Sequence, residues 1–213
     1  MRYWLALLFS AASFALAGVY YGRLPERMPV HWNLHGVVDA WLPKPTGAFA
    51  LPFETPFLTG ILIGVAPKAT NAAESGSMRR VYPTIVAAIA AFMLYLMIMV
   101  VRVGIGIELA VPSYAAIGLG VLFIVLGNYM GKVTRNWIVG VRTPWTLASD
   151  EIWSRTNRLG GCLLVLAGFV ITISAVLGYG TDFVLPAVIA AAAVPVGYSY
   201  VLARRLHGDK RNA

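Results

Sequence analysis

Six long apolar runs dominate this sequence and limit what it can fold into. A helix needs about 20 apolar residues to cross the hydrocarbon core of a bilayer. The runs are Tyr3–Gly22, Gly47–Ala66, Val81–Val101, Val111–Gly131, Leu159–Tyr179 and Phe183–Ala203. Only 12% of the 213 residues are charged, about half the share in soluble domains. The sequence therefore predicts an all-α integral membrane protein, a bundle of six transmembrane helices.

The positions of Lys and Arg predict the orientation of this bundle, because cytoplasmic loops of membrane proteins carry the excess of these residues. Of the 17 Lys and Arg, 13 lie at the end that holds both termini and the segments 67–80 and 132–158. The opposite end holds Arg23, Arg27, Lys44 and Arg102. We therefore expect both termini to be cytoplasmic. The net charge of +8 favours contact with anionic membrane lipids over direct binding of nucleic acid.

Two features of the apolar runs leave choices open. Arg2 and the sequence Ala15-Leu16-Ala17 give the first run an alternative role as a cleaved signal peptide, which would leave five spans. Small residues allow helices to approach closely in a membrane, so three stripes are expected to pack inside the bundle. The stripes are Ala11, Ala15, Gly18 and Gly22; Gly120, Gly127 and Gly131; and Gly161, Gly168 and Ala175.

The 22 residues LPERMPVHWNLHGVVDAWLPKP between the first two spans predict a short ordered outer cap. Four prolines exclude a continuous helix, and Gly36 offers a turn. His31, His35 and Asp39 would align as zinc ligands on a helix, but Gly36 interrupts that helix. We therefore expect no metal, and we expect His31 and Asp39 to form hydrogen bonds within the cap. The candidate binding residues of the cap are His31, Trp32, Asn33, Asp39 and Trp41, with Trp32 and Trp41 at headgroup depth.

The segment 127–161 predicts a structured inner loop between the fourth and fifth spans. It is longer than a turn requires and lacks the Gly/Ser composition of a flexible linker. Thr143 before Pro144 favours an extended backbone. Ser149 followed by two acidic residues predicts a helix start near Asp150. An anchoring belt of Trp and Arg at the membrane surface explains much of the composition. It does not explain three amides that indicate a neighbouring helix or a bound partner: Asn128, Asn136 and Asn157.

This segment resembles the signature of the SdpI family of membrane proteins, whose pattern is GN…N…G-[IV]-R-T-x-W-T-L…W…T-x-R-x-G. The matching residues are Gly127, Asn128, Asn136, Gly140, Val141, Arg142, Thr143, Trp145, Thr146, Leu147, Trp153, Thr156, Arg158 and Gly160. The outer cap is similar to a short domain of unknown function that often precedes this signature, with the pattern LP…P-[IV]-H-W-N-x-x-G-x-x-D-x-W. The expected division is residues 1–66, the first two spans with the cap, and residues 67–213, the SdpI-like region.

The resemblance implies a multi-pass protein of the bacterial inner membrane that protects its host from a secreted toxic peptide. The best-understood family member also captures a transcriptional repressor at the membrane. The implied partners are therefore a toxic peptide and a cytoplasmic repressor or other protein, with no cofactor. The candidate binding residues of the inner loop are Asn128, Asn136, Gly140, Arg142, Thr143, Trp145, Thr146, Trp153 and Arg158.

Glu54 supports an alternative function, proton- or solute-coupled transport. A carboxylate inside a span costs about 2.5–3.5 kcal/mol on insertion scales and is a functional candidate. Pro52 and Pro56 flank it, so a broken helix of the kind found at transporter sites is expected here. The alternatives are that Glu54 reaches the hydrated outer cap or pairs with Arg102. Catalysis is not expected, because Cys162 has no neighbouring His and no HExxH or GxSxG motif occurs.

Overall fold

The computed structural model describes residues 3–33, 35–65 and 76–209. Within these residues, six helices are long and apolar enough to cross a membrane. They are α1 (Trp4–Tyr20), α2 (Lys44–Val65), α3 (Gly76–Gly104), α4 (Val111–Met130), α6 (Asp150–Val176) and α7 (Val184–Asp209). Each overlaps one of the predicted runs, so the six-helix membrane fold is confirmed. Arg2, Lys68, Lys210 and Arg211, which the charge argument used, lie outside the described residues.

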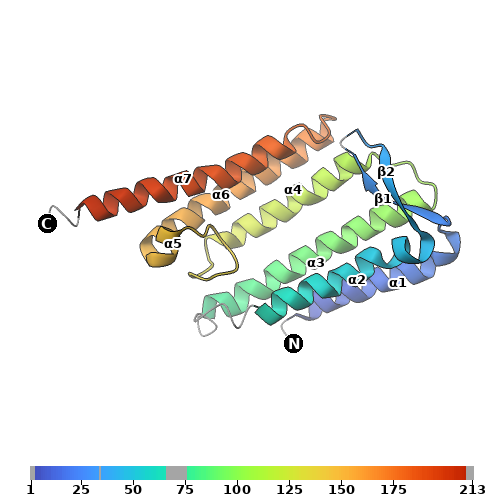
Figure 1. The fold of residues 1–213 in the computed structure, drawn as a ribbon, viewed down its shortest axis with the longest axis horizontal. Helices are drawn as coiled ribbons and strands as arrows, with labels where there is room; N and C mark the ends of the chain where they lie inside the picture. Colours follow the sequence, from blue (N-terminus) through green and yellow to red (C-terminus); the bar gives the residue numbers. More distant parts are fainter. Residues whose placement is uncertain (1–2, 34, 66–75, 210–213) are drawn as a thin grey trace.

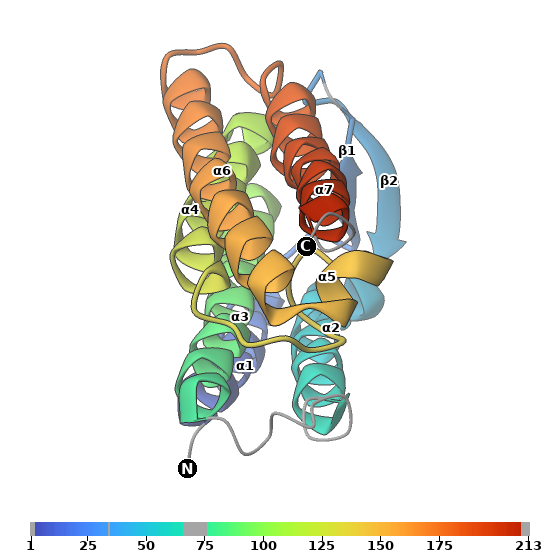
Figure 2. The same ribbon diagram turned by 90° about the vertical axis from the view of Figure 1, so that its left-hand side faces the viewer.

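The six helices form two halves of three. Helices α1, α2 and α3 pack on one another, α6 packs on both α4 and α7, and the contact of α3 with α4 joins the two halves. Figure 1 shows the α4, α6 and α7 half above the α1, α2 and α3 half. In the view along the bundle in Figure 2, α7 and α2 lie on the same side of the molecule.

A β-hairpin covers one end of the bundle, called here the hairpin end. After a short 3-10 helix, η1 (Tyr21–Arg23), strand β1 (Arg27–Trp32) pairs antiparallel with β2 (Val38–Pro43). The hairpin contacts α2 and α3, and Gly36 at its tip faces the ring of Pro112 at the start of α4. The predicted ordered cap is therefore present, and it is built from strands.

The opposite end, called here the loop end, holds the N-terminus of α1, the C-terminus of α7 and the 131–149 segment (Figure 1). This segment contains the short helix α5 (Pro144–Ala148). Val133 of the segment and Trp153 of α6 are buried against Ala6, Tyr82 and neighbouring residues of α1 and α3. The predicted structured loop is thus confirmed, and it connects the two halves at this end.

Glycines allow α4 and α6 to pack closely against each other. An added Cβ on Gly127 would lie 2.6 Å from the carbonyl oxygen of Gly161, and one on Gly168 would lie 2.5 Å from that of Gly120. Close backbone approach of this kind is the usual way in which membrane helices associate. Two of the predicted small-residue stripes therefore do form a helix contact.

The remaining predicted stripe, on α1, was assigned to the wrong face of that helix. Ala11, Ala15 and Gly18 of α1 are exposed, and an added Cβ at Gly18 or Gly22 would meet nothing within 4 Å. The buried face of α1 consists instead of Ala6, Ser10, Ser13 and Ala17. Small residues also occur on lipid-facing surfaces, so a stripe alone does not identify the packed side.

Helix α2 is continuous, and the expectation of a break at Glu54 was wrong. Pro52 and Pro56 both lie inside the helix. The hydroxyls of Thr55 and Thr59 donate to the carbonyls of Leu51 and Thr55 at 2.8 Å, so these polar groups are satisfied within the helix. Packing against α1 and α3 is consistent with the tolerance of proline in membrane helices.

Candidate binding sites at the two ends of the bundle

Asn33 shapes the turn of the hairpin. Its side-chain oxygen accepts hydrogen bonds from the backbone amides of His35 and Val37, both at 3.0 Å. Gly36 follows in the left-handed region, with φ of 79°, where glycine avoids the cost that a side chain would bring. Asn33 therefore serves the local fold of the cap as well as lining the cavity described below.

His31 and Asp39 face each other across the two strands. The ring Nδ1 of His31 lies 2.5 Å from Oδ1 of Asp39, and both side chains are largely accessible. The hydrogen bond expected within the cap is confirmed. The helical alignment that would have made His31, His35 and Asp39 zinc ligands is absent, because these residues lie on a hairpin. In the described chain, no group of three His, Cys, Asp or Glu is placed to hold a metal.

A cavity of about 630 Å³ lies beneath the hairpin, and we call it the hairpin cavity. It reaches from β1 down between α2, α3 and α4 to the start of α7, so both halves of the bundle contribute to it. Most of its wall is apolar, with Phe92, Leu96 and Met99 of α3 prominent. The complete lining is Val30, His31, Trp32, Asn33, Leu42, Gly47, Ala50, Leu51, Glu54, Phe92, Leu96, Met99, Val100, Val111, Pro112, Ala115, Ala116, Leu119, Thr181 and Val184.

Glu54 is an exposed residue of α2 that also lines this apolar cavity. It lies halfway between Lys44 and Gly64, the ends of the candidate span, about 15 Å along the helix from each. Among the described residues, no ion pair joins Glu54 to Arg102 or to another cation, so the expected pairing with Arg102 is not formed.

At the loop end, Asn136 holds the start of the 131–149 segment in shape. Its amide nitrogen donates to the carbonyls of Thr134 at 2.8 Å and Val139 at 3.1 Å. Its oxygen accepts from the amides of Ile138 at 2.7 Å and Val139 at 2.8 Å. The side chain is 3% exposed, so all its hydrogen-bonding capacity is used inside the fold.

Asn157 and Trp153 of α6 attach the same segment to the helix. The amide oxygen of Asn157 accepts from Val141 at 2.7 Å, and the indole of Trp153 donates to the carbonyl of Val133 at 2.8 Å. Gly140 lies between them with φ of 119°, and a Cβ there would be 2.5 Å from Oδ1 of Asn157. A glycine is therefore required for the segment to approach α6 this closely.

Thr143 and Thr146 build the short helix α5. Thr143 is extended, as predicted, and its hydroxyl accepts from the Thr146 amide at 3.2 Å. The Thr146 hydroxyl in turn accepts from the Thr143 amide at 2.7 Å. This reciprocal arrangement is a capping box. Trp145 at its start donates from the indole to Ser199 of α7 at 2.6 Å, so α5 is also attached to α7.

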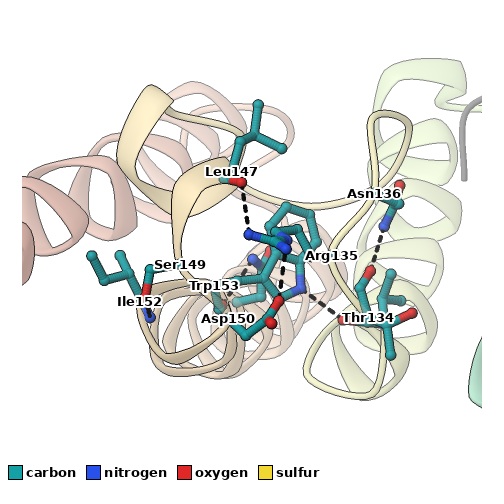
Figure 3. A network of polar contacts seen from close by, with 10 residues as sticks. Thr134, Arg135, Asn136, Leu147, Ser149, Asp150, Ile152 and Trp153 are labelled. Atoms are coloured by element: carbon teal, nitrogen blue, oxygen red, sulfur yellow. Dashed lines mark hydrogen bonds and ion pairs between the residues drawn. The ribbon is translucent and has the colours of Figure 1, made fainter. Parts of the chain in front are cut away.

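Two arginines of the loop end use their guanidinium groups within the protein. Arg135 donates to the carbonyl of Leu147 at 2.9 Å and lies 3.1 Å from Asp150 (Figure 3). In the same region Ser149 accepts from the amide of Ile152 and caps α6, which confirms the helix start predicted near Asp150. The exposed Arg142 donates to the carbonyl of Trp137 at 2.5 Å, while the Trp137 ring is 66% exposed.

Asn128 and Arg158 lie apart from this network. They are exposed residues on the facing helices α4 and α6, and Asn128 donates to the carbonyl of Ile124 within its own helix at 2.9 Å.

Sequence reasoning did not single out Ser199, Val133 or Lys132, although each contacts or lies beside a predicted residue. The partners of Ser199 and Val133 are 54 and 20 residues away in sequence, so local patterns carry no signal for these two residues.

These features define a class: a polytopic α-helical membrane protein with a hairpin-covered cavity at one end and a folded, cation-bearing segment at the other. Residues 132–199 match the model of the SdpI/YfhL protein family, and residues 8–54 match a domain of unknown function, DUF1648. The resemblance to the SdpI family is confirmed. The first match contains most of the loop-end network, and the second contains the hairpin and ends at Glu54.

A relative is similar along nearly the whole chain. The chain is 25% identical over 218 residues to "Immunity protein SdpI" of Bacillus subtilis (strain 168), with 97% of this chain and 98% of that protein covered. No solved structure matches the chain. The division of the chain near residue 66 stays a prediction.

Proposed function

We propose that this chain is an immunity protein of the bacterial inner membrane that protects its host cell by binding a secreted toxic peptide. The similarity to "Immunity protein SdpI" over 97% of the chain supports this function. Protection in this proposal comes from binding and requires no catalytic group or cofactor. The excess of Lys and Arg at the loop end favours a cytoplasmic location for that end, which leaves the hairpin end outside, where the peptide arrives.

The hairpin cavity is the observation that carries the proposal. Ligand pockets typically measure about 300–1,000 Å³ and are mostly apolar with a few polar groups, and this cavity of about 630 Å³ fits that description. A peptide that attacks membranes carries apolar side chains, which find apolar partners in Phe92, Leu96 and Met99. His31 and Asn33 at the hairpin supply polar groups for its backbone.

The exposed face of the 131–149 segment is the candidate surface for a cytoplasmic partner. Trp145, Thr146 and Asn136 are occupied by contacts within the fold. Trp137 and Arg142 remain accessible, and an exposed aromatic ring beside an arginine is typical of residues that dominate protein interfaces. A repressor or other protein would bind the loop end through this exposed surface. Reporter fusions that place this segment outside the cell would contradict this part of the proposal.

Filling the cavity tests the proposal directly. Bacillus subtilis cells that lack Immunity protein SdpI would express either the chain or its Ala115→Trp variant and be challenged with the toxic peptide. Ala115 lines the cavity, so the indole should abolish protection while the protein still accumulates in the membrane. The matched control is Ala11→Trp, because Ala11 is exposed on α1 and outside the cavity. Equal protection by both variants would overturn the role of the cavity.

Transport is a second candidate function, favoured by the carboxylate of Glu54 in the middle of α2, which forms no ion pair among the described residues. Glu54→Gln keeps the shape of the side chain and removes its charge. A transporter that couples to this carboxylate loses its activity, whereas binding through apolar contacts keeps most of it. Protection by Glu54→Gln within about twofold of the unchanged chain would favour binding, and complete loss with normal accumulation would favour transport.

A further inference from the structure

A second hollow, the α4–α6 groove, lies between α4 and α6 at the loop end. It has a volume of about 630 Å³, and its lining includes Gly131, Lys132, Arg158, Cys162, Val165 and Leu166. The glycines create it: Gly131 has no side chain, and an added Cβ would lie 3.4 Å from the Cα of Arg158. The close backbones form the floor of the groove, and longer side chains form its rim.

The rim has a cationic end and an apolar end. Lys132 and Arg158 lie toward the loop end, whereas Val165 and Leu166 lie about two helical turns deeper along α6, or about 10 Å. Leu166 is 58% exposed, so the deep end faces lipid. The groove therefore has the polarity of a phospholipid in the same leaflet, with its headgroup at the surface and its acyl chains below.

The cations of the groove differ from Arg135 and Arg155 in having no carboxylate partner in the described chain. Arg135 lies 3.1 Å from Asp150, and Arg155 lies 2.8 Å from Glu151. No such ion pair reaches Lys132 or Arg158 within the described residues. The Lys132 ammonium lies over the Tyr129 ring, 5.1 Å from its centroid. An anion at this point would meet two positive charges without displacing an acidic side chain.

We propose that the α4–α6 groove binds one anionic phospholipid, with the phosphate between Lys132 and Arg158 and an acyl chain against Val165 and Leu166. Basic pockets between transmembrane helices on the cytoplasmic side are suited to anionic headgroups. This inference does not depend on the proposed immunity function, because it concerns a different face of the bundle.

Native mass spectrometry of the full chain in detergent tests the proposal. Phosphatidylglycerol and phosphatidylcholine would be added at equal concentrations, and one retained phosphatidylglycerol per chain is expected in preference to phosphatidylcholine. The double variant Lys132→Gln/Arg158→Gln should lower this preference about tenfold. The matched control is Arg155→Gln, because Arg155 is a neighbouring arginine on α6 that pairs with Glu151, and it should keep the preference. Equal retention of the two lipids by the unchanged chain would overturn the proposal.

Cys162 provides a second measurement that does not require a variant. It is the single cysteine of the chain, it is exposed, and it lines the groove. Phosphatidylglycerol in nanodiscs should slow its reaction with a maleimide severalfold compared with phosphatidylcholine nanodiscs. Inorganic phosphate added to phosphatidylcholine nanodiscs should leave the rate unchanged. Equal rates in the two lipids, or full slowing by inorganic phosphate, would overturn the assignment to a lipid.

Discussion

The two ends of the bundle use their polar side chains in opposite ways. At the loop end, Asn136, Thr146 and Asn157 hydrogen-bond to backbone groups or side chains of their own surroundings and are buried. Toward the hairpin end, His31 of the hairpin and Glu54, halfway along α2, line a cavity, and Glu54 has no ion pair among the described residues. The densest sequence motif therefore encodes a local fold, whereas the sparser region leaves polar side chains along a cavity. Changes at the loop end should cost stability, and changes at the hairpin end should alter function more than stability.

Gly140→Ala should have the largest effect. The new Cβ would meet Oδ1 of Asn157 at 2.5 Å, in a backbone conformation with φ of 119°. Strain and the loss of a buried hydrogen bond should together lower the free energy of unfolding by about 3 kcal/mol, measured by thermal unfolding in detergent. Gly18→Ala is the control, since an added Cβ there meets nothing within 4 Å. Similar unfolding temperatures for the two variants would contradict the claim that the buried contacts of the loop end stabilise the fold.

Trp153→Phe should come next. It deletes the indole donor to the Val133 carbonyl, which lies 2.8 Å away in the buried core of the loop end. An unpaired buried carbonyl costs about 1–3 kcal/mol, and the same unfolding assay would detect this loss. Trp137→Phe, at a ring that is 66% exposed, should change stability by less than about 0.5 kcal/mol. If Trp137→Phe were the more damaging change, the exposed loop surface would have a structural role.

Ser199→Ala, also at the loop end, should lower the stability of the protein by a smaller amount. It removes the hydroxyl that accepts the indole hydrogen of Trp145 at 2.6 Å. Side-chain hydrogen bonds between membrane helices contribute about 0.6 kcal/mol on average, so a modest fall in unfolding temperature is expected. Ser154→Ala, at an exposed position of α6, should show no fall. A loss equal to that of Trp153→Phe would mean that α5 depends chiefly on α7.

Asp39→Asn should have the smallest effect on stability. Its hydrogen bond with His31 is exposed, and exposed pairs contribute at most about 1 kcal/mol. Protection against the toxic peptide should nevertheless fall, because His31 lines the cavity and loses the partner that orients it. Asp182→Asn, also exposed at the hairpin end, is the control for charge. Normal protection by Asp39→Asn would place the functional surface elsewhere.

The features that sequence predicted are those set by local chemistry. The length of the apolar runs identified the six helices. Ser149, followed by two acidic residues, identified the start of α6, and its hydroxyl accepts a hydrogen bond from the Ile152 amide there. Thr143 before Pro144 predicted the extended residue that caps α5. Each of these signals involves residues a few positions apart, so a single sequence contains it.

The features that sequence missed depend on which elements become neighbours. The strands of the hairpin pair through Pro29 and Trp41, and proline-rich segments carry a weak strand signal. The hairpin cavity draws its wall from the hairpin, α2, α3, α4 and the start of α7, and no local pattern joins these elements. The packed face of α1 was misassigned for the same reason, because the partner helix and not the residue size selects the face.

The length of α6 has a mechanical consequence. Its 27 residues extend about 40 Å, roughly 10 Å more than the hydrocarbon thickness of a bilayer, and its first turns carry the folded segment through Trp153 and Asn157. Because α6 packs closely against α4 at Gly127 and Gly168, we expect the two helices to move together. A change in the tilt of this helix pair at one membrane surface should therefore displace Trp137 and Arg142 at the other surface.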